Sequence, residues 1–170
     1  MENKMITILG TTATGKTKLA AQLAALIGGE IISADSRQVY RGMDLGTGKD
    51  LKDFNVNGLE IPYHLIDIVD PGYEFNVYEY QKLFFEAYQK VNENQHIPIL
   101  VGGTGMYIES VLKNYRMAKV VRNESLRLRL ANKTDEELIE ILLNNRVLHN
   151  TTDTKDRERI IRAIEIDLHY

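Results

Sequence analysis

The segment from Gly10 to Thr17 limits the possible folds of this chain more than any other feature. It reads Gly-Thr-Thr-Ala-Thr-Gly-Lys-Thr and matches the phosphate-loop pattern G-x-x-x-x-G-K-[ST] at every required position. An apolar run, Met5 to Leu9, comes directly before it, and apolar residues at helical spacing follow it as far as Ile27. The expected order is therefore a buried strand, a tight loop and an amphipathic helix that ends at Gly28.

The chemistry of such a loop follows from its backbone and its last two side chains. Glycines allow successive backbone N–H groups to point at phosphate oxygens, and the helix N-terminus adds partial positive charge. Lys16 adds a full positive charge, and the hydroxyl of Thr17 can bind Mg²⁺, the cofactor that we expect. A diphosphate or triphosphate is expected to bind to the whole loop: Gly10, Thr11, Thr12, Ala13, Thr14, Gly15, Lys16 and Thr17.

Strand and helix patterns alternate over the rest of residues 1–112. Three further apolar runs predict strands: Glu30–Ser33, His64–Val69 and Ile97–Val101. Asn76 and Glu79 have the spacing of a helix capping box, and the Gly-rich stretch 41–62 is expected to be a long loop. Alternating strands and helices are typical of parallel βαβ units. We therefore predict an α/β fold with a doubly wound, mostly parallel sheet and helices on both faces.

Beyond residue 112 the sequence shows helical patterns only. We expect a basic helical segment over residues 113–152 and a last helix over residues 153–170 that returns to the core. From Lys113 to Lys133 there are seven basic residues and one acidic residue. This run is either a solvated helix face or a surface that binds nucleic acid.

Composition excludes several classes of protein. The 21 Lys and Arg against 24 Asp and Glu give a net charge of −3. This charge argues against a protein whose whole surface binds nucleic acid. The absence of Cys excludes disulfides, thiolate metal sites and cysteine nucleophiles. No apolar run approaches the roughly 20 residues of a membrane helix, so we expect a cytoplasmic protein that makes no membrane contact.

Asp35 follows the second predicted strand, within the polar stretch 33–40. Because the carboxyl ends of parallel strands face the ligand crevice, Asp35 is expected beside the phosphate loop. Its carboxylate could accept a proton from a nucleophile, coordinate Mg²⁺ or cap a turn. Ser36, Arg37 and Gln38 add polar groups next to it, and a Gln amide can make paired hydrogen bonds to adenine.

The acidic residue with which ATPases and GTPases reach Mg²⁺ is missing from the end of the fourth predicted strand. That strand runs into Gly102-Gly103-Thr104, which contains no carboxylate. Asp67 and Asp70 follow apolar residues and are the remaining candidates for metal contact. The loop alone therefore leaves open which phosphate compound binds and what happens to it.

Five blocks of the chain together resemble the tRNA dimethylallyltransferases, also called tRNA isopentenyltransferases. The first block is the loop 10–17, which has Thr11 where Pro is usual in the family. The other four read SADSRQVYRGMD at 33–44, HLID with DP at 64–71, VGGTGMY at 101–107 and DRERIIRAIE at 156–165. The resemblance as a whole extends over residues 6–166, and the second and fourth blocks are highly specific to the family.

The resemblance implies transfer of a dimethylallyl group from dimethylallyl diphosphate to N6 of the adenosine next to the anticodon of tRNA. The loop would hold the diphosphate without hydrolysing a nucleotide, and Lys16 with Mg²⁺ on Thr17 would stabilise it as it leaves. The resemblance makes Asp35 the base at the adenine amine. It makes Thr104 a hydrogen-bond donor to the diphosphate, although Thr104 can also serve as a helix N-cap.

The same resemblance implies contacts with RNA. Asp35, Ser36, Arg37, Gln38 and Thr104 would face an adenosine that is flipped out of its stack. The anticodon stem-loop would contact Arg127 and five residues of the last block: Glu158, Arg159, Ile160, Ile161 and Arg162. The basic run is then expected to bind the RNA backbone. Because members of the family are longer, we expect this chain to lack a later part with a further core strand, and we expect the full-length protein to be a monomer.

Three other functions remain open on the sequence. Prenyl transfer to free adenine nucleotides would use the same chemistry, but the arginine-bearing helices over 113–162 favour a polymer as acceptor. A small-molecule kinase that binds ATP would share the phosphate loop, but it would leave Asp35 and the Gly102 block without a role. A fragment of this length could also bind diphosphate without catalysis.

Overall fold

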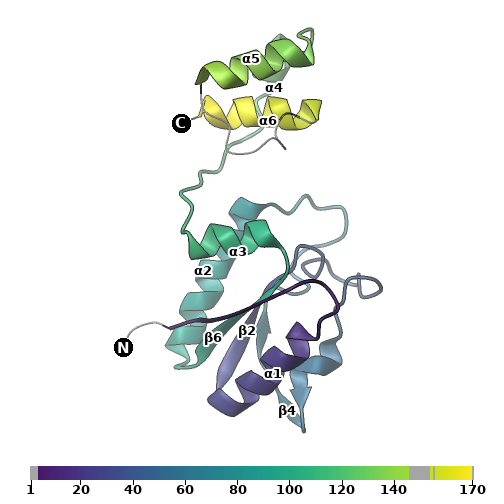
Figure 1. The fold of residues 1–170 in the computed structure, drawn as a ribbon, viewed down its shortest axis with the longest axis vertical. Helices are drawn as coiled ribbons and strands as arrows, with labels where there is room; N and C mark the ends of the chain where they lie inside the picture. Colours follow the sequence, from purple (N-terminus) through teal and green to yellow (C-terminus); the bar gives the residue numbers. More distant parts are fainter. Residues whose placement is uncertain (1–3, 146–153, 155, 170) are drawn as a thin grey trace. The chain divides into compact units, whose positions relative to one another are not determined.

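The computed structural model describes residues 4–145, 154 and 156–169, and the chain divides into two compact units (Figure 1). The first unit ends at Met117 and the second begins at Ala118. Each unit has buried apolar side chains of its own. Within the described residues, no helix is both long enough and apolar enough to cross a membrane.

A parallel sheet forms the centre of the first unit. Its strands are β1 (Ile6–Leu9), β2 (Gly29–Ala34), β5 (Tyr63–His64) and β6 (Ile97–Gly102), in the order β1-β6-β2-β5. Every neighbouring pair is parallel. Ile31 lies opposite Ile99 and Ile32 lies opposite Leu100. Since successive side chains of a strand point to opposite faces, each face of the sheet receives apolar side chains from both strands.

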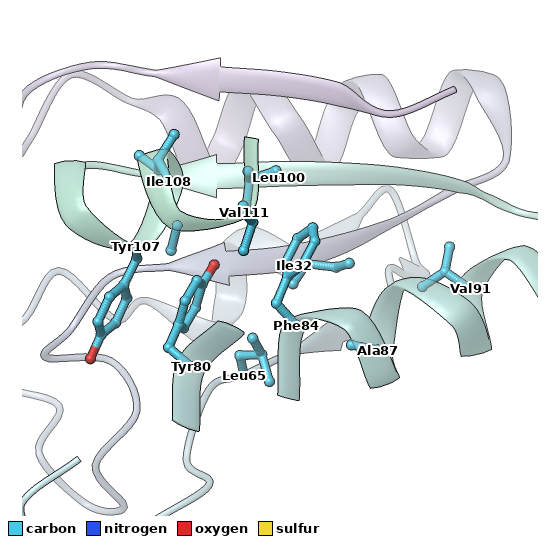
Figure 2. Packing of buried hydrophobic residues seen from close by; sticks show 11 residues of the cluster. Ile32, Leu65, Tyr80, Phe84, Ala87, Val91, Leu100, Tyr107, Ile108 and Val111 are labelled. Atoms are coloured by element: carbon cyan, nitrogen blue, oxygen red, sulfur yellow. The ribbon is translucent and has the colours of Figure 1, made fainter. Parts of the chain in front are cut away.

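Helices cover both faces of this sheet, which confirms the predicted doubly wound α/β fold. On one face, α1 (Lys16–Ile27) packs its alanines against Ile31 and Ile99. On the other face, α2 (Val77–Glu93) and α3 (Gly105–Leu112) form an apolar cluster with Ile32 and Leu100 (Figure 2). The predicted capping box at the start of α2 is present, because Asn76 and Glu79 each accept a hydrogen bond from the other's backbone N–H.

The third predicted strand is much shorter than expected. Only Tyr63–His64 pairs with β2, because Leu65 and Asp67 have left-handed backbone conformations with φ of 63° and 55°. The backbone N–H of Asp67 donates instead to the carbonyl of Gln38 at 3.0 Å. The segment after β5 is thereby joined to the polar stretch that follows β2.

Residues 41–62, expected to be a long loop, contain short regular elements. A 3-10 helix, η1 (Leu51–Phe54), is followed by an antiparallel hairpin of β3 (Asn55–Val56) and β4 (Leu59–Glu60). The turn of this hairpin consists of Asn57 and Gly58, whose φ values are 54° and 88°. Two positive φ angles are what a tight two-residue hairpin turn requires, and Asn-Gly supplies them at low cost.

Three helices form the second unit: α4 (Glu124–Leu130), α5 (Asp135–Asn145) and α6 (Arg157–Asp167). They share one buried cluster, made of Leu126, Leu130, Leu138, Leu142, Ile160, Ile161, Ala163 and Ile164. The apolar face of the last helix, α6, packs on α4 and α5 within this unit, and the expectation that this helix returns to the α/β core stays a prediction. The predicted basic helical segment is helical only in part, since residues 115–123 have no regular secondary structure.

Candidate functional site

The phosphate loop connects β1 to α1, in the order that the sequence predicts. Gly15, which comes directly before the helix, has φ of 77°, a conformation that strains any residue with a side chain. Ala13 is also left-handed, with φ of 63°. Since α1 begins at Lys16, the positive end of the helix dipole lies at the loop.

The ammonium group of Lys16 lies against the loop that precedes it. It donates to the carbonyl of Thr11, and it lies 3.4 Å from the hydroxyl of Thr14. That hydroxyl in turn donates to the carbonyl of Thr11 at 2.9 Å. The ammonium group of Lys16 is therefore held by oxygens of the loop itself.

A crevice with a volume of about 210 Å³ lies beside the loop. Residues 12–17 form one side of it, whereas Gly10 and Thr11 are not among its lining residues. The strands β2 and β6 and the segments that follow them contribute other lining residues: Ile31, Ser33, Asp35, Gln38, Val101, Gly102 and Gly103. The structure thus places Asp35 and Gln38 beside the phosphate loop.

Asp35 is half-buried directly after β2 and lines the crevice. One carboxylate oxygen, Oδ1, accepts a hydrogen bond from the backbone N–H of Arg37 at 2.9 Å. This bond makes Asp35 the cap of a turn, one of the roles considered from the sequence. A carboxylate can accept several hydrogen bonds at once, so the turn leaves Asp35 able to accept a proton or to bind a cation.

Thr104 connects the ends of β2 and β6. It stands at the N-cap position of α3, but its side chain makes no capping hydrogen bond. Its hydroxyl instead accepts from the backbone N–H of Ser36 at 3.0 Å and donates to the hydroxyl of Ser36 at 3.4 Å. The residue therefore orients the turn that carries Asp35, and the N-cap role foreseen for its side chain is wrong.

Gly102 allows the two strand ends to come this close. A Cβ atom on Gly102 would lie 2.2 Å from the carbonyl oxygen of Ala34, far inside van der Waals contact. The backbone N–H of Thr104 donates to this same carbonyl at 3.1 Å. The glycine is therefore a requirement of the close approach of β2 and β6 at the crevice.

The three residues after Asp35 differ in exposure and contacts. Gln38 is buried, and its amide accepts from the hydroxyl of Ser33 at 3.0 Å and donates to the carbonyl of Gly48 at 3.2 Å. Arg37 is exposed and donates to the carbonyl of Gly46 at 3.4 Å. Both side chains thus hold the loop 41–49 next to the crevice, and Ser36 is held by Thr104.

Tyr107 of α3 belongs to the apolar cluster that α2 and α3 form on the sheet. Its ring stacks on that of Tyr80, with centroids 4.0 Å apart and an interplanar angle of 9° (Figure 2). Burial raises the pKa of Tyr107 to about 12, and the negative charges of Tyr40, Glu79 and Asp35 act in the same direction. Tyr107 therefore stays neutral at every physiological pH.

The residues near the crevice fit Mg²⁺ only in the company of a phosphate. Thr17 and Asp35 both line the crevice, but no cluster of three His, Asp or Glu side chains within the described residues could hold a metal ion. Mg²⁺ commonly binds through one hydroxyl or carboxylate, substrate phosphates and water, and this donor set fits that mode. Asp67 and Asp70, the other candidates for metal contact, do not line the crevice. Asp67 instead forms an ion pair with Lys49, and Asp70 forms one with Arg41.

In the second unit, Arg127 belongs to an internal ion-pair network. Its guanidinium donates to Glu165 at 2.7 and 3.0 Å and to Glu158 at 2.7 Å, and its side chain is only 12% exposed. Hydrogen bonds from Arg127, Asn123 and Arg162 outweigh the cost of burial and lower the pKa of Glu165 to about 2. The structure thus gives Arg127 a role within its own unit.

The predicted RNA contacts of the last block fall into two groups. Ile160 and Ile161 are buried in the cluster of the second unit, so the prediction that they contact RNA is wrong for their side chains. Glu158 and Arg159 are exposed. Arg162 is half-buried and donates to Glu165 at 3.0 Å and to the carbonyl of Val120 at 2.7 Å.

Sequence reasoning missed the part of the loop 41–49 that reaches the site. Thr47 and Gly48 line the crevice, and Lys49 beside them is a buried charge. The pattern of the sequence holds no signal for this arrangement other than the block 33–44, which ends just before it. A buried lysine becomes visible only when its distant partner, Asp67, is known.

Comparisons with known proteins place this geometry in a family. The IPP transferase family model matches residues 38–169, which is more than half of the chain. A relative called tRNA dimethylallyltransferase 2, from Bacteroides fragilis, is 59% identical over 166 residues, which cover 98% of this chain and 54% of the relative. A relative called tRNA dimethylallyltransferase 1, from Geotalea daltonii, is 57% identical over 163 residues, which cover 95% of this chain and 52% of the relative.

Solved structures agree with the sequence comparisons. The full-length tRNA isopentenylpyrophosphate transferase of Bacillus halodurans matches 97% of this chain with a TM-score of 0.64 and 34% identity, over 55% of its own length. A eukaryotic dimethylallyltransferase acting on tRNA matches 97% of this chain with a TM-score of 0.79 and 28% identity, over 41% of its own length. The chain spans about half the length of the curated relatives that it matches. On these matches, the chain belongs to the IPP transferase family.

Proposed function

We propose that the protein transfers a dimethylallyl group from dimethylallyl diphosphate to N6 of the adenosine next to the anticodon of tRNA, with release of diphosphate. The observation that carries this proposal is the crevice in which the phosphate loop and the carboxylate of Asp35 line the same space. A cationic cradle beside a single carboxylate suits a reaction in which a diphosphate leaves and a nucleophile loses a proton. Membership of the IPP transferase family supports the same chemistry.

The donor half of the reaction belongs to the phosphate loop. The diphosphate would bind to the amides of residues 12–17, the part of the loop that lines the crevice at the N-terminus of α1, within reach of Lys16. Negative charge accumulates on the diphosphate as the bond to the allylic carbon breaks, and Lys16 would stabilise this charge. Mg²⁺, held by the hydroxyl of Thr17 and the phosphates, would supply further positive charge.

The acceptor half belongs to the end of β2. The exocyclic amine of adenine is a poor nucleophile, because its lone pair is delocalised into the ring. It gains positive charge as it attacks, so a carboxylate beside it would stabilise that charge and accept the proton. Asp35 would take this role, and Thr104 would keep the turn of Ser36 in place. The adenosine would have to leave its stack to reach the crevice.

Contact with the RNA backbone would come from exposed cations of the basic run and of α6. Lys119, Arg122, Arg129 and Arg159 are exposed, and cations of this kind neutralise phosphates without reading sequence. Arg127 would support this surface from inside the second unit through Glu165.

The direct test compares wild-type protein with Asp35→Asn, which keeps an oxygen for the turn with Arg37 but removes the base. Asp70→Asn is the matched control, since its carboxylate is exposed and lies outside the crevice. Each protein is incubated with labelled dimethylallyl diphosphate and an unmodified anticodon stem-loop RNA. We expect Asp35→Asn to lower transfer by about 100-fold to 10,000-fold, with unchanged affinity for the donor, and Asp70→Asn to retain transfer.

Parallel incubations offer AMP beside the RNA as acceptor, or supply ATP, and other outcomes of these assays would overturn the proposal. Label that enters AMP and not RNA would indicate a free nucleotide as acceptor. Turnover of ATP without prenyl transfer would indicate a kinase. Wild-type protein that binds the donor but transfers nothing would indicate a diphosphate-binding fragment, and full transfer by Asp35→Asn would remove Asp35 from the role of base.

A further inference from the structure

Lys49 is a fully buried charge next to the crevice. Its side chain is 0% exposed, although lysine is among the residues that are rarely buried. Its ammonium group donates to the carbonyl of Tyr40 at 2.9 Å, to the carboxylate of Asp44 at 2.9 Å and to that of Asp67. These three acceptors match the three N–H groups of an ammonium, so every donor of Lys49 has a partner.

The three partners show what Lys49 holds together. Tyr40 stands at the start of the loop that Lys49 ends, so the contact with its carbonyl closes the segment 40–49 into a ring. Asp67 lies in the left-handed segment after β5, whose backbone also bonds to Gln38. Burial alone would lower the pKa of Lys49, but hydrogen bonds to Asp67 and Asp44 outweigh it and raise the pKa. The ammonium group of Lys49 therefore stays charged at neutral pH.

The ring that Lys49 closes forms part of the crevice wall. Thr47 and Gly48, directly before the lysine, line the crevice. The hydroxyl of Thr47 donates to the carbonyl of Met43 at 2.7 Å, and the carbonyl of Gly48 accepts from Gln38 at 3.2 Å. The bond from Gln38 to Gly48 joins this wall to the turn that carries Asp35.

We propose that Lys49 is a positioning residue for the acceptor: its buried ammonium clips the loop 40–49 to Asp67 and so holds Thr47, Gly48 and Gln38 as the wall against which the acceptor adenosine lies. The proposal rests on the proposed function, because it deepens the role of the same site. An apolar residue would fill the same volume without desolvating a charge, and a buried ion pair is often no more stabilising than an apolar replacement. An apolar side chain, however, cannot make directed hydrogen bonds that join the carbonyl of Tyr40 to the carboxylates of Asp44 and Asp67.

The test uses Lys49→Met, which keeps the length of the side chain and removes the charge. Because this variant leaves Asp67 without its cation, the double variant Lys49→Met with Asp67→Asn is measured beside it. Lys52→Met is the matched control, since Lys52 is exposed and lies outside the crevice. Three quantities are measured for each protein: amide exchange over residues 41–49, affinity for dimethylallyl diphosphate, and kcat and KM for the stem-loop RNA.

For both Lys49 variants we expect exchange over 41–49 to become at least about tenfold faster, while exchange in α2 and β6 and the affinity for the donor stay at wild-type values. We expect the KM for RNA to rise and kcat/KM to fall by up to about 100-fold, the effect of misplacing a reacting group by about 1 Å. The control should match wild type. If Lys49 only stabilised the fold, slower transfer would be accompanied by faster exchange in α2 and β6. The double variant would then regain wild-type exchange and wild-type transfer.

Unchanged exchange over 41–49, or wild-type kcat/KM in the double variant, would overturn the assignment of Lys49. The failure of the proposed function would look different, because wild-type protein itself would then transfer no label to RNA. In that case the exchange measurement alone decides whether Lys49 holds the wall of the crevice.

Discussion

Replacing Glu165 by Gln should destabilise the second unit while leaving its shape intact. The carboxylate of Glu165 is 0% exposed. It accepts from Arg127 at 2.7 and 3.0 Å, from Arg162 at 3.0 Å and from the backbone N–H of Asn123 at 2.9 Å. Glutamine has almost the same size but no charge, and its amide cannot accept all of these bonds. The change therefore isolates the charge of this network.

The lowered pKa of Glu165 sets the magnitude. A fall from 4.5 to about 2, at about 1.4 kcal/mol per unit, corresponds to about 3 kcal/mol at neutral pH. A group whose pKa is lowered in the folded state contributes stability that is complete above its unfolded pKa and is lost as pH falls through its folded pKa. The difference between wild type and Glu165→Gln should therefore be constant from pH 7 to about 5 and shrink between pH 4.5 and 2.

Native-state amide exchange at pH 7 measures the opening free energy of α4 and α6, with α2 of the first unit as internal reference. Calorimetric unfolding of both proteins at several pH values gives the pH dependence. Glu158→Gln is the matched control, because Glu158 bonds to the same arginine but its side chain is 68% exposed, and exposed pairs contribute about 1 kcal/mol or less. Equal losses in the two variants, or a difference that persists at pH 2, would refute the reasoning.

Two further predictions concern the sheet of the first unit. Gly102→Ala should destabilise this unit by about 1–3 kcal/mol and impair diphosphate binding, because the new Cβ would lie 2.2 Å from the carbonyl oxygen of Ala34. Gly105→Ala, where a Cβ meets nothing within 4 Å, is its control, and equal melting temperatures would contradict the expectation. Burial alone would raise the pKa of Glu30, but hydrogen bonds outweigh it and lower the pKa; the partners are His64, His96 and Asn94. The stability that Glu30 contributes should then be complete above pH 4.5 and decline below it. Urea unfolding of wild type and Glu30→Gln should show a difference that narrows on acidification, and a constant difference would exclude this account.

Local patterns predicted most of the first unit. A strand, a glycine-rich loop and a helix follow from residues adjacent in sequence, and so does the capping box at Asn76. The parallel order of the sheet follows from the alternation of strands and helices. The Asn57-Gly58 turn was also readable, since this dipeptide is a strong hairpin signal, but its neighbouring strands are only two residues long and give no periodic pattern.

The candidate site was predictable to the extent that strand ends determine it. Asp35 lies beside the phosphate loop because β2 ends there. The resemblance also assigned RNA contacts to Ile160 and Ile161, although their spacing with Ile164 already indicated the apolar face of a helix. The structure places all three in the core of the second unit.

The sequence by itself determined the glycine-rich loop of the candidate phosphate site and the strand and helix on either side of it, because such features depend on residues a few positions apart. Only the tertiary structure decided that Lys49 meets Asp67 and that Arg127 meets Glu165. It also decided that the segment after His64 leaves the sheet. These outcomes depend on contacts between residues that are far apart in the chain, whose energies appear only when folding has brought the charges together and removed water from around them.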